Sequence, residues 1–106
     1  MASGPIPLTA RMGVWQQDLT ADQAATDWYC PSPGDFTLGV SGIWTGSLKV
    51  QRSFDGGVTA VDYTTLDQPF APTTNFSTDF SQSERNVLWR MIFNRSSGTA
   101  TPRFGQ

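Results

Sequence analysis

Histidine is absent from the 106 residues of this chain. Its absence removes Ser–His–Asp and Cys–His catalysis, histidine-ligated metals, and the side chain that most often acts as a general base near neutral pH. Paired carboxylates of the glycosidase kind remain as an acid–base option. Most Asp residues, however, stand in segments of turn composition, where a carboxylate caps backbone N–H groups. We therefore expect no enzymatic activity, no metal and no cofactor.

Cysteine is nearly absent too. Cys30 stands alone, so the chain can form neither an internal disulfide nor a thiolate metal cluster. The N-terminus carries no apolar run of about 7–15 residues, and no run anywhere approaches about 18 residues. We accordingly expect neither a secretory signal nor a membrane span.

Charge is sparse, at 15% of residues, and the formal net charge is −2. A general nucleic-acid binder usually presents a basic face, so we expect no nucleic-acid partner. The charge is unevenly placed: residues 1–47 hold four Asp and one Arg, whereas residues 84–106 hold four Arg and one Glu. This asymmetry could guide head-to-tail contacts between copies, although scattered solvated charge is the simpler interpretation.

Aromatic residues and two-residue alternation are what the chain does have. Four Trp and seven Phe supply large apolar surfaces for a core. Apolar and polar residues alternate over 36–41, 48–51, 76–80 and 87–93, as in strands with one buried face. We predict an all-β fold, an antiparallel sandwich or small barrel of jelly-roll or immunoglobulin-like type, with one domain over 13–106.

Three short segments are assigned by their turn or helix signals. SGIWTG at 41–46 is predicted as a turn or bulge, and SSG at 96–98 as a turn. Thr20 and Asp22 resemble helix N-caps ahead of two alanines, which predicts a helix of a turn or two at most.

The first twelve residues are predicted to form an extended N-terminal arm. Pro5 and Pro7 forbid regular helix or a central strand there, while Ile6 and Leu8 still carry apolar side chains. The arm is either a frayed terminus or a segment that orders on a neighbouring molecule.

Six side chains are the candidate protein interface. They are apolar or aromatic residues of the arm, of the segment that follows it, and of a proline-rich loop edge. The set comprises Ile6, Leu8, Val14, Trp15, Trp28 and Tyr29.

The stretch QRSFDGGVTA, residues 51–60, admits three interpretations. A phosphate-binding loop would need a lysine and a following helix, and a calcium loop would need more oxygen ligands. Asp-Gly between two alternating runs is instead typical of a β-hairpin. We assign Asp55, Gly56 and Gly57 to a structural hairpin turn.

Residues 53–59 resemble the Asp-box, S-x-D-x-G-x-T-W, of sialidase-like propellers, with Ala60 in the place of the Trp. The motif occurs once here, and in propellers it is a structural turn, so the resemblance does not imply sialidase activity.

Residues 34–106 are similar to small β-sandwich proteins of tailed-bacteriophage virions. The similarity rests on a strand that ends in QRSFDGG, a later NVLWRMIF strand, and a closing SGTATPR strand. It implies a virion structural role, and we predict a capsid decoration (cement) protein that stabilises the outer capsid surface. Its partners would be the major capsid protein and copies of itself, with a homotrimer as one candidate assembly, and it would enter the virion in the bacterial cytoplasm.

Two alternatives remain open. The first is a head–tail connector or a tail or fibre protein of the same virion. The second is a carbohydrate-binding module that stacks Trp28 and Tyr29 on sugar rings.

Overall fold

The computed structural model describes residues 10–65 and 68–106, and within them the chain forms strands and loops without a helix. The strands are β1 (Trp15–Gln16), β2 (Ala24–Ala25), β3 (Gly34–Ser53), β4 (Val61–Asp62), β5 (Thr64–Thr65), β6 (Gln68–Pro69), β7 (Phe76–Gln82) and β8 (Leu88–Gly105). The predicted all-β antiparallel fold is confirmed. Nearly all of the predicted arm, including Ile6 and Leu8, lies outside the described residues.

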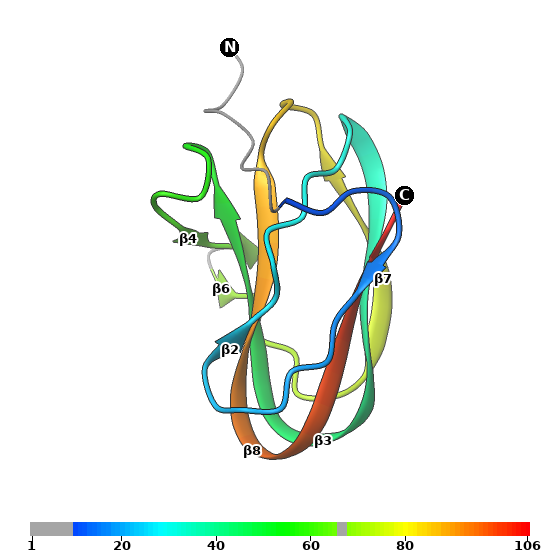
Figure 1. The fold of residues 1–106 in the computed structure, drawn as a ribbon, viewed down its shortest axis with the longest axis vertical. Helices are drawn as coiled ribbons and strands as arrows, with labels where there is room; N and C mark the ends of the chain where they lie inside the picture. Colours follow the sequence, from blue (N-terminus) through cyan, green and yellow to red (C-terminus); the bar gives the residue numbers. More distant parts are fainter. Residues whose placement is uncertain (1–9, 66–67) are drawn as a thin grey trace.

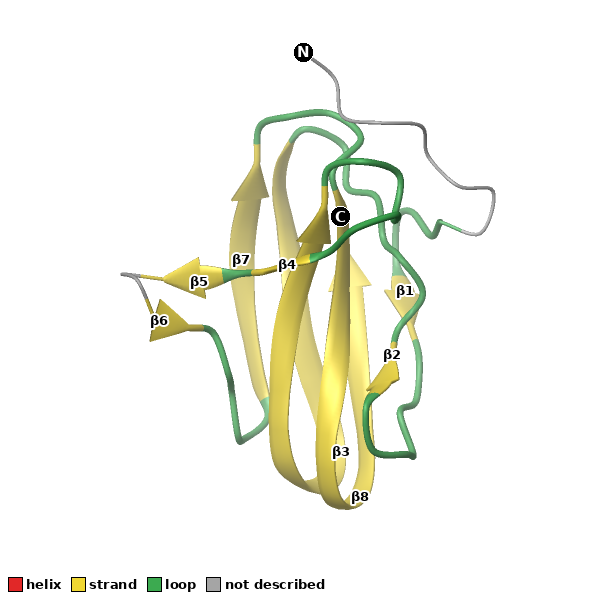
Figure 2. Cartoon of the chain, turned by 90° about the vertical axis from the view of Figure 1, so that its left-hand side faces the viewer, coloured by secondary structure: helices red, strands yellow, loops and turns green. Residues whose placement is uncertain are grey.

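Two long strands, β3 and β8, form the frame of the molecule. They pair antiparallel from Thr37 opposite Gly105 to Ser53 opposite Leu88. A straight strand of the 20 residues of β3 would extend about 66 Å at roughly 3.3 Å per residue, whereas the longest dimension of the molecule is 40 Å. The two-stranded ribbon therefore bends back on itself, at the lower end of Figures 1 and 2.

The bend turns one ribbon into two facing layers. One layer holds the first half of β3 and the last half of β8, flanked by β7 and β1; the other holds the remaining halves, flanked by β4 and β2. The six strands form one hydrogen-bonded sheet folded into a sandwich, and β5 and β6 form a separate small hairpin.

A β-bulge at Ser96 lets both halves of β8 face the same core. Thr45 pairs with Ser97 but Gly46 pairs with Arg95, so Ser96 is one residue extra on β8. Because strand side chains alternate between faces, one inserted residue exchanges the faces of everything beyond it. The β8 members of the core cluster are accordingly odd-numbered before the bulge and even-numbered after it: Trp89, Met91 and Phe93, then Ala100 and Phe104. Leu88 and Ile92 are buried too but do not belong to this cluster.

Glycines permit the bend of the two long strands. The turn predicted at residues 96–98 was wrong, because these residues are part of a strand. Both 41–46 and 96–98 lie inside continuous strands. Residues 41–46 do not form the predicted turn, and the bulge lies on the opposite strand, where the register shifts beside Thr45 and Gly46. Gly46 has φ +127°, and a Cβ on it would lie 2.1 Å from the carbonyl oxygen of Asn94. A Cβ on Gly98, which has φ +81°, would lie 2.2 Å from that of Ile43. Side chains are thus excluded where the two strands bend together.

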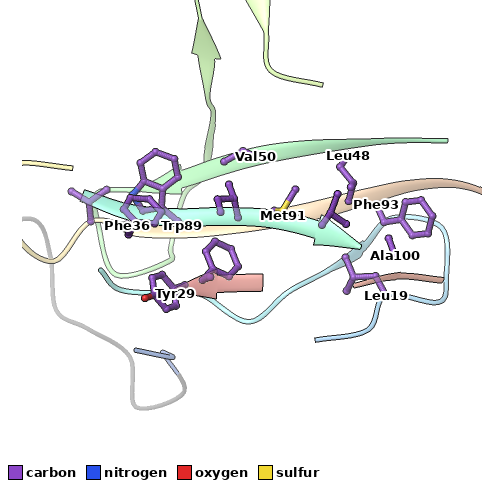
Figure 3. Close-up of a cluster of buried hydrophobic side chains, with 13 residues drawn as sticks. Leu19, Tyr29, Phe36, Leu48, Val50, Trp89, Met91, Phe93 and Ala100 are labelled. Carbon is purple, nitrogen blue, oxygen red and sulfur yellow. The ribbon is translucent and has the colours of Figure 1, made fainter. Parts of the chain in front are cut away.

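The core fills the space between the layers (Figure 3). Aromatic rings dominate it: Trp89 meets Phe36 edge-on at a centroid distance of 4.9 Å, and Tyr29 stacks on Phe104 at 4.7 Å. The other buried members are aliphatic or small: Leu19, Leu38, Val40, Leu48, Val50, Val87, Met91 and Ala100, with Phe93 beside them.

Residues 10–33 run along β8 and cover its free edge. They pair with it through β1, β2 and two bridges, Leu19 with Ala100 and Tyr29 with Trp89. The short helix predicted after Thr20 is not formed. Instead the Asp22 carboxylate accepts a hydrogen bond from the backbone N–H of Arg95 at 3.0 Å, which ties the turn to β8.

This path also brings the acidic first part of the chain alongside the basic last strand. The Asp22 carboxylate bonds the backbone of Arg95, and Asp18 accepts a hydrogen bond from the Thr101 hydroxyl at 2.8 Å.

Deleting Ser96 should destabilise the protein severely, because either Ala100 and Phe104 or the earlier half of β8 must then turn outward. We expect the free energy of unfolding to fall by at least about 3 kcal/mol, the cost of removing one core phenylalanine. Urea denaturation followed by tryptophan fluorescence measures it. Ser96→Ala keeps the residue count and should stay within about 0.5 kcal/mol of wild type; equal stability of the deletion variant would refute the role of the bulge.

Candidate functional site

The loop that joins β3 to β4 is the part of the surface with the most distinctive construction. β3 and β4 pair through Gln51 with Asp62 and Arg52 with Val61, so the chain reverses over residues 53–60. Asp55, Gly56 and Gly57 lie in this loop, and the glycines have φ +75° and +91°. The reversal takes more residues than a two-residue hairpin turn, because a side-chain network fills its interior.

Asp55 is the centre of that network. Its Oδ1 accepts hydrogen bonds from the backbone N–H of Thr59 at 2.9 Å and the Ser53 hydroxyl at 2.8 Å. Its Oδ2 accepts from the Thr59 hydroxyl at 2.5 Å. The backbone N–H of Gly57 in turn donates to the Ser53 oxygen at 2.8 Å. The loop is thereby tied to Ser53, the last residue of β3.

These donors also act on the charge of Asp55. The hydroxyl of Thr59 first, then its backbone N–H and the Ser53 hydroxyl, lower the pKa of the Asp55 carboxyl from its ordinary value of 3.8. Hydrogen bonds to the ionised form stabilise that form, so at neutral pH the carboxylate is held in its bonding geometry.

Apolar side chains project from this loop. We call Phe54, Val58 and Val61 the hairpin-tip patch; their exposed fractions are 40%, 83% and 50%. Phe54 and Val58 alternate with the bonded residues of the network, which use the inside of the loop and leave the outside to the apolar groups. Single exposed apolar residues are ordinary, but three on one braced hairpin make it a candidate contact surface.

Arg52 and Trp28 pack against the β3–β4 loop. The Arg52 guanidinium lies 5.2 Å from the centroid of the Phe54 ring and 5.4 Å from that of Trp89, which links the patch to the core. Trp28 packs against the glycine turn, since a Cβ on Gly57 would lie 2.8 Å from the Trp28 Nε1. These cation–π and packing contacts connect the loop to the core.

Trp28 is only partly available to a ligand. The Arg90 guanidinium lies 4.4 Å from the centroid of its indole ring and also donates two hydrogen bonds, at 3.0 and 2.9 Å, to the Gln51 side chain. Burial lowers the pKa of Arg90. One face of the indole is thus covered, which weakens the prediction that Trp28 stacks on a sugar ring.

Tyr29 was wrongly assigned to an interface. Its side chain is fully buried, it stacks on Phe104, and its hydroxyl donates to the carbonyl oxygen of Gly13 at 2.5 Å. The proline-rich loop beside it suggested an edge, whereas the bridge from Tyr29 to Trp89 draws the residue into the sandwich.

The remaining interface candidates differ in their exposure to solvent. Val14 is 64% exposed, while Trp15 is half-buried beneath the Arg11 guanidinium, 4.2 Å from its ring centroid. Ile6 and Leu8 lie outside the described residues. Outside the hairpin tip and this N-terminal segment, Ile43, which pairs with Thr99 in the bent part of the ribbon, is 92% exposed. The bend lies at the opposite end of the molecule from the β3–β4 loop (Figure 1).

Reactive groups are few. Cys30 is buried, and burial raises the pKa of its thiol, so little of it is thiolate at neutral pH. In the part of the chain that the structure describes, no three His, Cys, Asp or Glu side chains gather as metal ligands. Nor is there, over residues 10–65 and 68–106, a helix of the length and apolarity needed to cross a bilayer.

The hairpin-tip patch was missed at the sequence level. The Asp-Gly-Gly turn was interpreted only as a corner, and its apolar neighbours were left unassigned. The usable signal was the alternation of Ser53, Asp55, Gly57 and Thr59 with Phe54 and Val58, because the first set must bond inward and the second must then face out.

Comparison of the chain with protein-family models, with curated proteins and with solved structures gives no match.

The pKa of Asp55 should rise towards 3.8 in the Thr59→Val variant, which loses the hydroxyl that lowers it most. The folded pKa lies below the unfolded one, so the stabilisation by Asp55 is fully present above the unfolded pKa and is lost as pH falls through the folded pKa. The side-chain carboxyl ¹³C shift of Asp55, followed by NMR titration, reports the pKa.

Unfolding measurements test the same linkage. The loss of stability in Asp55→Asn should be present at neutral pH and should shrink in acid below the folded pKa.

Thr20→Val, on an exposed threonine away from the loop, is the matched control for the NMR titration of Thr59→Val. An unchanged Asp55 pKa in Thr59→Val would show that the network does not hold the carboxylate.

Proposed function

We propose that this chain is a structural protein of a tailed-phage virion that decorates the outer surface of the capsid. The virion assignment comes from the similarity of residues 34–106 to small virion β-sandwich proteins. The observation that carries a binding role is the hairpin-tip patch, in which Phe54, Val58 and Val61 are exposed on a loop braced by Asp55.

The hydrogen bonds of Asp55 matter for binding, because a loop that is already ordered loses little conformational entropy on association. Fully burying one Val or Phe side chain contributes roughly 1.5–3 kcal/mol. A modest patch of this kind gives weak binding for one copy, and a decorated shell presents the same contact many times.

In this function the protein would bind across neighbouring copies of the major capsid protein and also contact copies of itself. Binding that is specific for the assembled shell lowers its free energy relative to the dissociated or expanded states, and so stabilises it. The predicted arm, with Ile6 and Leu8, stays a prediction as a second contact. Arg11, within the predicted arm of residues 1–12, exchanges backbone hydrogen bonds of 2.8 Å with Trp28 and Cys30.

Val58→Asp should weaken binding to undecorated capsids of the phage that encodes this chain by at least about tenfold, because it places a charge in the buried centre of the contact. Co-sedimentation of purified protein with capsids measures the affinity. Ile43→Asp is the matched control, an equally exposed β-branched residue at the opposite end of the molecule, and should leave binding unchanged. The reverse pattern, or no effect of Val58→Asp, would exclude the hairpin tip as the capsid contact.

The number of copies in the particle should separate decoration from the rival head–tail or tail role. A decoration protein repeats over the shell, on the order of hundreds of copies, whereas a connector forms a ring of about six or twelve. Quantitative mass spectrometry of purified virions, with an electron-microscopy map of the same particles, gives both number and position. A single ring at the portal vertex would replace the decoration proposal, and absence from purified virions would overturn both roles.

A further inference from the structure

The sandwich has four outer strand edges in its described part, and they differ greatly in length. β1, β2 and β4 are each two residues long, whereas β7 has seven. Short edges offer few free backbone groups to another strand. β7 pairs with β3 on one side, and on its other side no described residue pairs with it.

β7 also lacks the devices that usually protect a long edge. Its sequence, FSTDFSQ, contains no proline, lysine or arginine, and its seven pairs with β3 run without a bulge. Its single charge is Asp79, which accepts a hydrogen bond from the Thr37 hydroxyl at 3.0 Å. This edge is regular and open, as in sheets that accept a further strand.

The two faces of β7 have different chemistry. Phe76, Thr78 and Phe80 stand opposite the core residues of β3, and the two phenylalanines are half-buried. Phe70 meets both rings edge-on at centroid distances of 5.6 Å. Ser77 and Asp79 face outward and are exposed. Each ring therefore keeps part of its surface exposed.

We propose that β7 pairs with β7 of a second copy of this chain, antiparallel about a two-fold axis, so that the two sheets become one. A two-fold axis perpendicular to the sheet places the core-facing sides of both copies on the same side of the joined sheet. Only registers in which core-facing residues of one β7 stand opposite core-facing residues of the other are therefore allowed. The cross-strand side-chain pairs differ between these registers and determine which one is favoured.

With Thr78 opposite Thr78 of the second copy, Phe76 lies opposite Phe80 and Ser77 opposite Asp79, each pair occurring twice. Aromatic pairs and hydroxyl–carboxylate pairs are favourable across strands. The neighbouring register, centred on Asp79, would oppose two carboxylates and lose the aromatic pairs. The register centred on Phe80 would place Asp79 opposite Ser81 but would keep only one aromatic pair. The strand is therefore most self-complementary in the register centred on Thr78, and this favours a second copy as its partner. The proposal is independent of the virion assignment.

Ser77 and Ser81 provide a matched test, because they are exposed serines on the same face of the same strand. In the favoured register Ser77 lies opposite Asp79 of the second copy, whereas Ser81 lies beyond the paired span. The dimer dissociation constant of the full chain is measured by sedimentation equilibrium over a wide concentration range, for wild type and for Asp and Lys variants at each position.

Ser77→Asp should raise the dissociation constant about 2- to 30-fold and Ser77→Lys should lower it by a similar factor, since each change acts twice per dimer. Ser81→Asp and Ser81→Lys should change it less than about twofold. Circular dichroism checks that each variant is folded. A wild-type chain that stays monomeric at millimolar concentration would overturn the proposal. So would a dimer in which the two Ser77 variants shift the constant in the same direction, or in which the Ser81 variants act as strongly.

Discussion

The pairing of β3 with β8 supports every other strand of the main sheet. The strands β1 and β2 pair with β8, β4 and β7 pair with β3, and the facing sides of the same two strands carry most of the core. The ribbon becomes a sandwich only because it bends, and the bend requires close backbone contact at Gly46 and Gly98 together with the extra residue at Ser96. Burial of the aromatic core then stabilises the bent form over an open ribbon.

The bend also gives the molecule two different ends. One end is the continuous bend of both strands, where Asn75 of the loop before β7 bonds Gly42 and Trp44. The other end carries the β3–β4 loop and the β7–β8 loop (Figure 2). The β3–β4 loop belongs to the second end, where Ser53 connects its side-chain network to the last pair of the long ladder. An apolar group placed there is held by the rigidity of the sheet, which allows an exposed loop to behave as a fixed surface. β7 lies along the side of the sandwich, and its last residue, Gln82, accepts a hydrogen bond from the Arg52 guanidinium at the loop end.

Strand character could be predicted from the sequence because alternation is a local property. Phe36 to Val40 and Val87 to Phe93 were assigned correctly, and the all-β class followed from them. The continuity of the long strands could not be predicted in this way. Gly98 with positive φ serves equally in a reversal between strands and in a sharply bent strand, and only the distant partner strand distinguishes the two. The burial of Tyr29 depends in the same way on β8, far along the chain.

The order of pairing in the long ladder bears on how the chain reaches its native state. Ser53 and Leu88 are the pair closest in sequence, and each step towards Thr37 and Gly105 joins residues further apart. Closing such loops costs chain entropy before much core is buried, so the ladder is best closed progressively from the Ser53–Leu88 end. A nascent chain would hold its aromatic residues unsheltered until residues 88–105 had left the ribosome. Because the fold is built on one bent ribbon, the chain should collapse slowly and late in synthesis. Until then it needs protection from aggregation.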